Sequence, residues 1–137
     1  MPNDQSCWPA HGEQDIMEMI NGDGIVHGTY HVTPPAPPGG AAQCGNNTSE
    51  GGALPIEDFD TVYHEYAIER RLDSLAFVYD SIVAYNSSGG ARRVEPGIAW
   101  YTILNFAVGG PWPKPVNEST EFPCSTTIDY VRVSTPA

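Results

Sequence analysis

The chain has 137 residues and a formal net charge of −11, with 17 acidic residues against 6 Lys and Arg. Its length allows one domain, residues 1–137, with room for a buried core. Its acidity argues against nucleic acid or an anionic membrane surface as a partner, and the sequence holds no apolar run of about 18 residues that would span a membrane.

Residues 12–19 form the first predicted element and carry three carboxylates, those of Glu13, Asp15 and Glu18. On a strand, side chains two apart share a face, so Glu18 joins the other two only if a residue near Met17 is bulged out. On an α-helix, at about 100° per residue, Glu13 and Glu18 would lie roughly 140° apart. Acids crowded on one face repel one another, which is costly for structure alone and typical of a catalytic site. A solvated acidic strand, or a helix with its apolar residues inward, is the alternative interpretation.

The sequence Asn-Gly-Asp-Gly at residues 21–24 predicts a tight turn after this strand. Residues 25–32 alternate in polarity and predict the returning strand of a hairpin, with His27, Thr29 and His31 on one face. In that pairing the polar faces of the two strands coincide. We therefore expect the three carboxylates to lie beside the two histidines and Thr29.

Pro and Gly, with 13 and 14 residues, are concentrated at residues 33–55 and 109–123, which excludes helix there and predicts long loops. Elsewhere, short runs of β-branched and aromatic residues bounded by turn signals predict strands. These runs are residues 62–69, 75–79, 82–85, 100–108 and 127–133. The pattern predicts an all-β domain without internal repeats.

Four Asn-X-Ser/Thr sequons favour a eukaryotic secretory origin, with a coincidence of polar loops as the alternative. They begin at Asn46, Asn47, Asn86 and Asn117. The first residues lack the basic and apolar regions of a signal peptide, so we expect an extracellular protein whose leader is not in this chain.

The cysteines, Cys7, Cys44 and Cys124, are odd in number. In an oxidising compartment at least one of them is therefore free or paired outside this chain. Their spacing from the histidines does not match a zinc site. Loss of a partner cysteine with an absent segment is a simple explanation for the odd count.

Four blocks of sequence carry a more specific pattern: W-P-A-H-G-E-Q-D-I-M-E-M at residues 8–19, V-H-G-T-Y-H at 26–31, I-L-N-F-A-V-G-G-P-W-P at 103–113 and I-D-Y-V-R-V at 128–133. In content, order and separation they resemble glycoside hydrolase family 16, in its laminarinase-like and endo-β-1,3(4)-glucanase branch. The resemblance covers nearly the whole chain but corresponds to the C-terminal half of the family domain. It implies a concanavalin A-like β-jelly-roll sandwich, incomplete because the N-terminal strands are missing, with a glucan-binding cleft on its concave face.

The resemblance also implies retaining glycoside hydrolysis, with Glu13 as nucleophile, Glu18 as general acid/base and Asp15 as the assisting acid. Retaining chemistry needs the nucleophile and acid/base carboxyl groups about 5–5.5 Å apart, so both side chains must lean inward, as a concave sheet encourages. Glu18 must hold a proton while Glu13 is ionised, and must act as base once Glu13 carries the sugar.

Other site residues are expected from the same resemblance. Trp8 precedes the acids closely enough to stack on a sugar ring, with core packing as the alternative, and His31 occupies the position of a cleft histidine. Trp112, in a Gly/Pro-rich loop, is a candidate second sugar platform. Asp129 matches a residue that contributes to a structural calcium ion, with a surface carboxylate as the alternative. We expect no other cofactor.

The chain departs from the family pattern at three places. Gln14 replaces an aliphatic residue and points an amide toward the core, which costs about 1–3 kcal/mol unless it is hydrogen-bonded. Arg70 stands where the family has tryptophan, and the pair Asp80-Ser81 stands where it has Asp-Gly.

The expected partner is a β-glucan polysaccharide, and the complete protein is expected to be a monomer. Three other functions stay open: a glucan-binding module without catalysis, a transglycosylase that uses the same intermediate, and an inactive fragment with exposed strand edges. The intact acids argue against the binding module. Met17 argues against the plant transglycosylases, because those relatives tend to lack this residue.

Overall fold

The computed structural model describes residues 1–3, 6–34, 44–71, 73–88 and 97–135. Its contacts group the chain into two units, Met1–Ile103 and Leu104–Ala137. The described residues form strands, turns and irregular segments without any helix, which confirms the all-β prediction. It follows that no described helix is long and apolar enough to cross a membrane.

The first sheet contains β1 (Glu13–Met19), β2 (Ile25–Val32) and β3 (Thr48–Pro55) in the order β1-β2-β3, with both pairs antiparallel. β1 and β2 form the predicted hairpin. Asn21 and Gly22 in its turn have φ values of 54° and 63°, which Asn and Gly tolerate best. The Asp23 carboxylate accepts a hydrogen bond from the Ile25 N–H at 3.0 Å and closes the turn.

The second sheet contains β4 (Tyr66–Arg70), β5 (Ser74–Tyr79) and β6 (Ile82–Ser88), again antiparallel and in chain order. Asp80 and Ser81 join β5 to β6 with φ values of 44° and 70°, so both residues of this two-residue turn are left-handed. The Asp80 carboxylate accepts the Glu65 N–H at 2.9 Å and lies 2.6 Å from His64 Nδ1. These contacts fix the segment that leads into β4.

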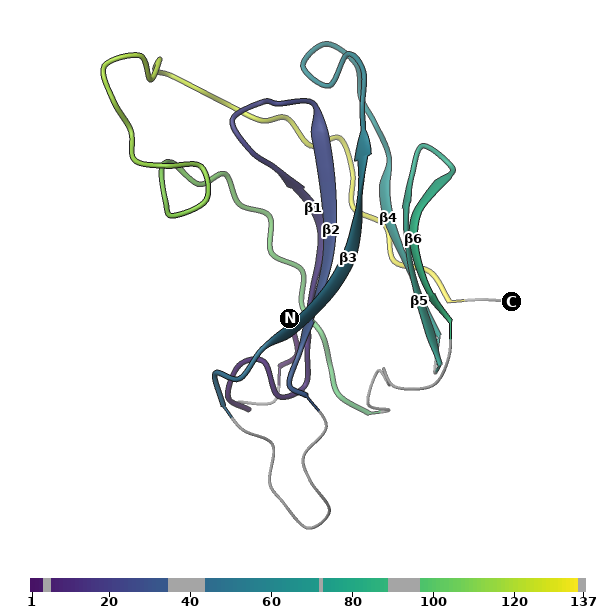
Figure 1. Cartoon of the computed structure of the whole chain (residues 1–137). Coiled ribbons are helices and arrows are strands. Elements are labelled where there is room, and N and C mark those ends of the chain that lie inside the picture. The colour runs from purple at the N-terminus through teal and green to yellow at the C-terminus, as the bar shows by residue number, and fades with distance from the viewer. Residues whose placement is uncertain (4–5, 35–43, 72, 89–96, 136–137) are drawn as a thin grey trace. The chain divides into compact units, whose positions relative to one another are not determined.

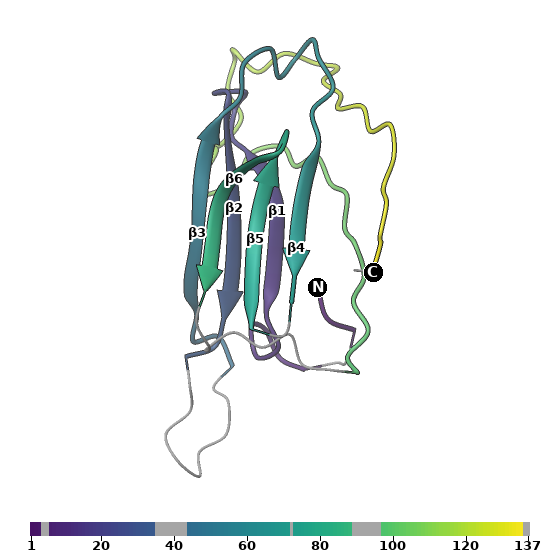
Figure 2. The same cartoon turned by 90° about the vertical axis from the view of Figure 1, so that its right-hand side faces the viewer.

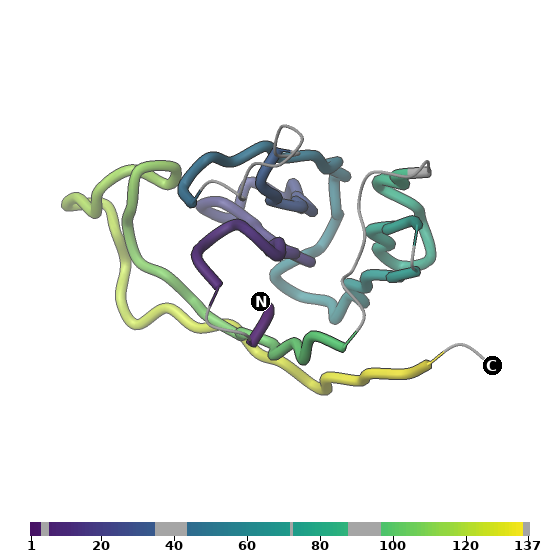
Figure 3. Tube along the Cα trace, turned by 90° about the horizontal axis from the view of Figure 1, so that it is seen from below, coloured from purple at the N-terminus to yellow at the C-terminus, as the bar shows by residue number. Residues whose placement is uncertain are grey.

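The two sheets pack face to face within the first unit (Figures 1 and 2). Seen from below, the purple and blue trace of β1 to β3 lies beside the teal and green trace of β5 and β6 (Figure 3). The core comes mainly from inward positions of the central strands β2 and β5. Its buried side chains are Val26, Tyr30, Ile56, Leu75, Phe77 and Tyr79. This arrangement fits an incomplete jelly-roll sandwich and leaves the other face of β2 for function.

β3 corrects the sequence prediction, which placed residues 33–55 in one long loop. Gly51, Gly52 and Pro55 weaken the strand pattern of this segment, although the segment pairs with β2 along its whole length. A Cβ on Gly52 would lie 2.3 Å from the Ala84 carbonyl oxygen, so glycine lets β3 lie close against β6. Residues 35–43 of the predicted loop lie outside the described residues.

The predicted strands at residues 100–108 and 127–133 are a second correction. Both segments are described, and neither forms a strand; Trp100 makes only an isolated bridge with Pro2. Likewise residues 62–65 precede β4 rather than belong to it. Apolar alternation marks residues that suit a strand, but a ladder also needs a partner strand. Among the described residues these segments make isolated backbone hydrogen bonds, such as those between Tyr101 and Met1, and no ladder. Residues 109–123 are irregular, as predicted.

Candidate active site

The three carboxylates project from one face of β1. The ladder pairs Glu13 with His31, Asp15 with Thr29 and Glu18 with His27, and its register shifts between Asp15 and Glu18. Two residues of β1 therefore oppose one residue of β2 at this point, which is the definition of a β-bulge. The bulge predicted from the spacing of the acids is confirmed, as is their placement beside His27, Thr29 and His31.

Each acid has its own hydrogen-bonding neighbour. The indole Nε1–H of Trp8 donates to Glu13 Oε2. The His31 Nε2 lies 3.2 Å from Asp15 Oδ2, and the Thr29 hydroxyl donates to Glu18 Oε2 at 3.1 Å. A loop and the facing strand thus hold the three side chains separately.

Trp8 lies in a loop that is tied to the start of β3. Cys7 forms a disulfide with Cys44, and the Gly45 N–H donates to the Trp8 carbonyl at 2.9 Å. Trp8 is 42% exposed, and its ring tilts against the His31 ring, with 5.9 Å between the ring centroids. Core packing, the alternative interpretation of Trp8, does not fit this exposure. Cys124, the third cysteine, is free and exposed.

His31 is held from both sides. Its Nε2 faces Asp15, and its Nδ1 lies 3.0 Å from Asn47 Nδ2 and 3.3 Å from Asn47 Oδ1. When Nδ1 accepts the Asn47 amide, the ring proton lies on Nε2 and is directed to Asp15. From the sequence, Asn47 was recognised only as the start of a sequon. Its contact with His31 could not be predicted, because it depends on the position of β3.

Asp15 is the acid whose protonation the site alters most. The pKa of Asp15 is raised from its ordinary 3.8 to about 7, chiefly by burial and also by the charges of Glu13 and Glu18, while His31 opposes the rise. Near neutral pH the middle carboxyl therefore exchanges a proton readily. The site can accordingly hold a proton between two further carboxyl groups, which suits acid and base chemistry on a bond laid across this face.

The chain is similar to several known proteins. No protein-family model matches the chain. It is 33% identical over 138 residues to a protein of Rhodothermus marinus named Beta-glucanase, a match that covers 92% of this chain and 45% of that protein. It is 29% identical over 133 residues to a Keratan-sulfate endo-1,4-beta-galactosidase of Sphingobacterium multivorum, covering 92% of this chain and 29% of that protein.

A solved structure is also similar. It comes from work on endo-acting O-glycanases with which prominent members of the human gut microbiota initiate mucin breakdown, and it aligns with a TM-score of 0.52 at 26% identity. The alignment covers 63% of this chain and 29% of that one. The chain thus spans less than half the length of each of these proteins.

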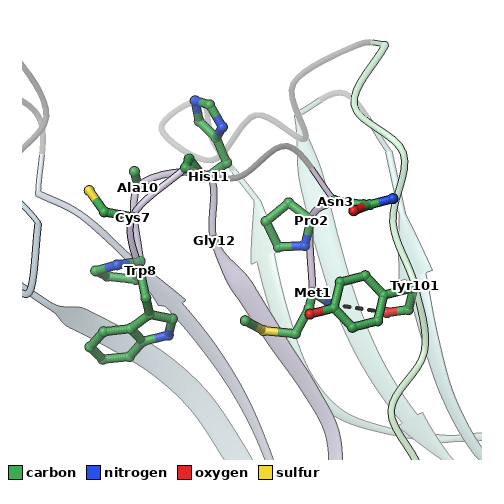
Figure 4. Close-up of a pocket in the computed structure, with 11 residues that line it drawn as sticks. Met1, Pro2, Asn3, Cys7, Trp8, Ala10, His11, Gly12 and Tyr101 are labelled. Atoms are coloured by element: carbon green, nitrogen blue, oxygen red, sulfur yellow. Dashed lines mark hydrogen bonds between the residues drawn. The ribbon is translucent and has the colours of Figure 1, made fainter.

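A hollow lies beside the Trp8 loop. Its volume is about 260 Å³, and its lining includes Trp8, His11 and Gly12 on one side and Tyr101 on another (Figure 4). Natural small-molecule pockets begin near 300 Å³, so this hollow is small and open. It gives the region next to Glu13 a shaped surface with an aromatic wall.

The remaining predicted site residues lie in the second unit. Trp112 is half exposed, and its use as a sugar platform stays a prediction. Asp129 is exposed, and among the described residues no group of three or more His, Cys, Asp or Glu side chains could hold a metal ion. The described side chains therefore do not build a calcium site around Asp129, and that role stays an expectation from the resemblance.

Two departures from the family pattern have structural outcomes. Gln14 points inward, and its Nε2 is buried without a hydrogen-bond partner among the described residues, as the strand pattern implied. The Arg70 guanidinium lies 4.3 Å from the centroid of the Trp100 ring, a cation–π contact. The position therefore carries an arginine that packs on a tryptophan from another part of the chain, where the family has a tryptophan.

Proposed function

We propose that the protein is a retaining endo-β-glycosidase of glycoside hydrolase family 16 that hydrolyses β-1,3- or mixed β-1,3/1,4-glucan. The observation that carries the proposal is the bulge between Asp15 and Glu18, which brings three separately held acids onto one sheet face. The similarity to a β-glucanase over 92% of the chain supports the substrate class.

In this mechanism Glu18 gives its proton to the glycosidic oxygen while Glu13 attacks the anomeric carbon. The bond from that carbon to the leaving oxygen breaks, and a covalent glycosyl ester forms on Glu13. Glu18, now ionised, then takes a proton from water, and the resulting hydroxide displaces Glu13. Two inversions at the same carbon give net retention.

The neighbours of the two glutamates suit these roles. An indole N–H can only donate, so Trp8 suits a Glu13 that is ionised when it attacks. A hydroxyl can donate or accept, so Thr29 can follow Glu18 through both its ionised and its protonated form. Asp15, with a pKa of about 7, lies between them on β1 and limits the repulsion between the acids when it is protonated.

A β-galactoside-containing glycan is the second candidate substrate. It is favoured by the similarity to a keratan-sulfate endo-β-galactosidase and to a structure from work on O-glycanases. The acids and their roles would be the same, and only the sugar contacts would differ. Non-catalytic binding and transglycosylation are further alternatives that the same assay separates.

The test is a substrate panel of laminarin, mixed-linkage β-1,3/1,4-glucan and keratan sulfate, read by release of reducing ends. For the whole protein, of which these 137 residues by resemblance correspond to the C-terminal half of the domain, we expect turnover of a glucan, with proton NMR showing the β-anomer first. An initial α-anomer would disprove the retaining mechanism. Turnover of keratan sulfate alone would show that the substrate is a β-galactoside-containing glycan and not a β-glucan. Binding of laminarin without cleavage would indicate the binding module, and products longer than the substrate would indicate transglycosylation.

Glu18→Gln tests the role of the acid/base. We expect it to slow cleavage of poor leaving groups by about 10²–10⁴-fold while sparing activated aryl glycosides, because only a poor leaving group needs the proton. Glu13→Gln is the matched variant and should abolish both reactions. Equal losses on both substrates in Glu18→Gln would remove Glu18 from this role.

We also propose an extracellular location and a monomeric complete protein. The sequons and the Cys7–Cys44 disulfide support the location, since disulfides persist in oxidising compartments. Size-exclusion chromatography with light scattering tests the oligomeric state. Detection of the protein with its disulfide in the culture medium of its source tests the location.

A further inference from the structure

The bulge that aligns the acids is contacted from the opposite sheet by a tyrosine. Tyr79, the last residue of β5, donates its hydroxyl proton to the backbone carbonyl of Ile16 at 2.9 Å. Ile16 and Met17 are the two residues of β1 that fall between the paired positions Asp15 and Glu18. The hydroxyl therefore bonds the backbone at the irregular point of the ladder, where a bulge leaves one residue outside regular pairing.

Gly28 makes this contact sterically feasible. Asp15 pairs with Thr29 and Glu18 with His27, so Gly28 is the residue of β2 that faces the bulge. A Cβ on Gly28 would lie 2.3 Å from the Tyr79 hydroxyl oxygen and 2.6 Å from Phe77 Cγ. Any side chain here would displace the tyrosine, so the glycine provides the space through which the hydroxyl reaches β1.

Tyr79 is well suited to act as a fixed donor. Its side chain is fully buried at 0% exposure and packs edge-on against the Tyr66 ring, with 5.7 Å between the centroids. Burial and, secondarily, the charge of Glu18 raise the pKa of the Tyr79 hydroxyl, so it keeps its proton through the working range of pH. A rigid, protonated phenol gives the bulge carbonyl one defined partner.

The placement of Glu18 depends on this bulge. Successive strand residues alternate between faces, so without the extra residue Glu18 would point away from Glu13 and Asp15. Thr29 bonds Glu18 on the site face, and Tyr79 bonds the preceding backbone from the core face. The acid is thus fixed from both sides of the sheet.

We infer that Tyr79 is a positioning residue, which holds the β1 bulge through its hydroxyl and thereby keeps Glu18 in line with Glu13. The inference deepens the proposed function and rests on it for its catalytic consequence. The phenol touches no substrate, since it lies beneath the sheet. Its effect on the reaction passes through the backbone of Ile16 and Met17.

The test compares Tyr79→Phe with Tyr66→Phe. Both variants delete one hydroxyl from a tyrosine of the same ring pair, and within the described residues the Tyr66 hydroxyl makes no hydrogen bond. We expect Tyr79→Phe to lower kcat on laminarin about 10- to 100-fold with KM within about twofold, because orientation of the acid is lost and substrate contacts remain. Tyr66→Phe should leave both constants near those of the unmodified protein.

Amide hydrogen exchange measures the positioning without any turnover. Tyr79→Phe should accelerate exchange at residues 16–18 at least about tenfold, with Tyr66→Phe and the β4–β5 pairs as internal references. Unchanged exchange at the bulge would overturn the inference, as would faster exchange with an unchanged kcat. If the unmodified protein cleaves no glycan, the proposed function fails, and the exchange result alone decides whether Tyr79 holds the bulge.

Gly28→Ala provides an independent variant in case Tyr79→Phe does not fold. The added methyl displaces the hydroxyl from Ile16 while the phenol itself is retained. It should reproduce the faster exchange at residues 16–18 and the loss of kcat. A Gly28→Ala protein with the exchange pattern of the unmodified chain would contradict the inference.

Discussion

Asp15 and His31 meet from neighbouring strands, with 3.2 Å between the carboxylate Oδ2 and the imidazole Nε2. The histidine offsets only part of the cost of burying this carboxyl group between Glu13 and Glu18, since the pKa of Asp15 still rises to about 7. The site therefore keeps an acid in an environment that opposes its charge. This is a typical conflict between stability and function.

Asp15→Asn should stabilise the fold at alkaline pH. The folded pKa of about 7 lies above the ordinary 3.8, so the stability linked to this group is full below pH 3.8 and is lost as pH rises through about 7. We expect the variant to raise the free energy of unfolding by about 2–4 kcal/mol at pH 8 and to have no effect near pH 3.5. Urea unfolding of the variant and the unmodified protein at both pH values measures this difference in the free energy of unfolding. Asp60→Asn, on an exposed loop, is the control, and an equal gain in both variants would contradict the argument.

Gln14→Leu should also stabilise the protein. The Gln14 amide nitrogen is buried without a partner among the described residues, on the inward face opposite Tyr30. Leucine removes this unpaired donor at similar volume, which should add about 1–3 kcal/mol to the free energy of unfolding. Gln14→Glu, which buries a charge at the same place, should destabilise. A lower Tm for Gln14→Leu in thermal melts would mean that the amide is hydrogen-bonded.

Trp8 should affect binding and catalysis through different parts of its side chain. Trp8→Ala removes the exposed ring and should raise KM for laminarin about tenfold, a loss of about 1.4 kcal/mol. Trp8→Phe keeps an aromatic face but loses the N–H that bonds Glu13, so KM should change little while kcat falls. Trp112→Ala, assayed beside them, tests the predicted second platform. A tenfold rise in KM for Trp8→Phe would show that the indole N–H, and not the ring face, binds the sugar.

The ion pair of His64 and Asp80 should stabilise the second sheet in a limited pH window. The hydrogen bond to Asp80 raises the pKa of His64, so its contribution is full below pH 6.5 and is lost as pH rises through the raised value. The hydrogen bond from His64 lowers the pKa of Asp80, so that contribution is present above pH 3.8 and is lost as pH falls through the lowered value. The pair therefore acts fully between about pH 4 and 6.5.

His64→Gln should lower the Tm most near pH 5 and less near pH 9. Asp80→Asn and the double variant complete a cycle that isolates the coupling between the two side chains. Asp80 also accepts the Glu65 N–H, so Asp80→Asn alone should lower the Tm more than His64→Gln does. A coupling that is constant from pH 5 to pH 9 would contradict the ionic origin of the contact.

The hairpin that carries the three acids could be predicted because its determinants are local. The spacing of Glu13, Asp15 and Glu18 required a bulge, and the turn residues at 21–24 fixed the pairing of the two strands. β3 could not be predicted, because Gly51 and Gly52 resemble loop residues, and only the structure shows Gly51 close against Gly28 of β2 and Gly52 close against Ala84 of β6. The contact of Tyr79 with Ile16 joins residues 63 positions apart and leaves no local signal.

The opposite error arose at residues 100–108 and 127–133, where the pattern of apolar residues predicted strands that the structure does not contain. A pattern shows which residues suit a pleated sheet, but pairing depends on a partner elsewhere in the molecule. The acid with the raised pKa was also beyond sequence reasoning. The pKa of Asp15 is raised mainly because this carboxyl group is buried, and the spacing of the acids does not show which of them is buried.

The bridge between Cys7 and Cys44 makes the aromatic side of the site dependent on redox conditions. It joins residues 37 apart, and closing a loop of that length is worth about 2–4 kcal/mol to the folded state. β1 and β2, by contrast, are held by hydrogen bonds and core packing that no reductant reaches. Protein produced in a reducing cytosol would therefore keep its three acids aligned on the hairpin, while the indole that contacts Glu13 lost its covalent tether.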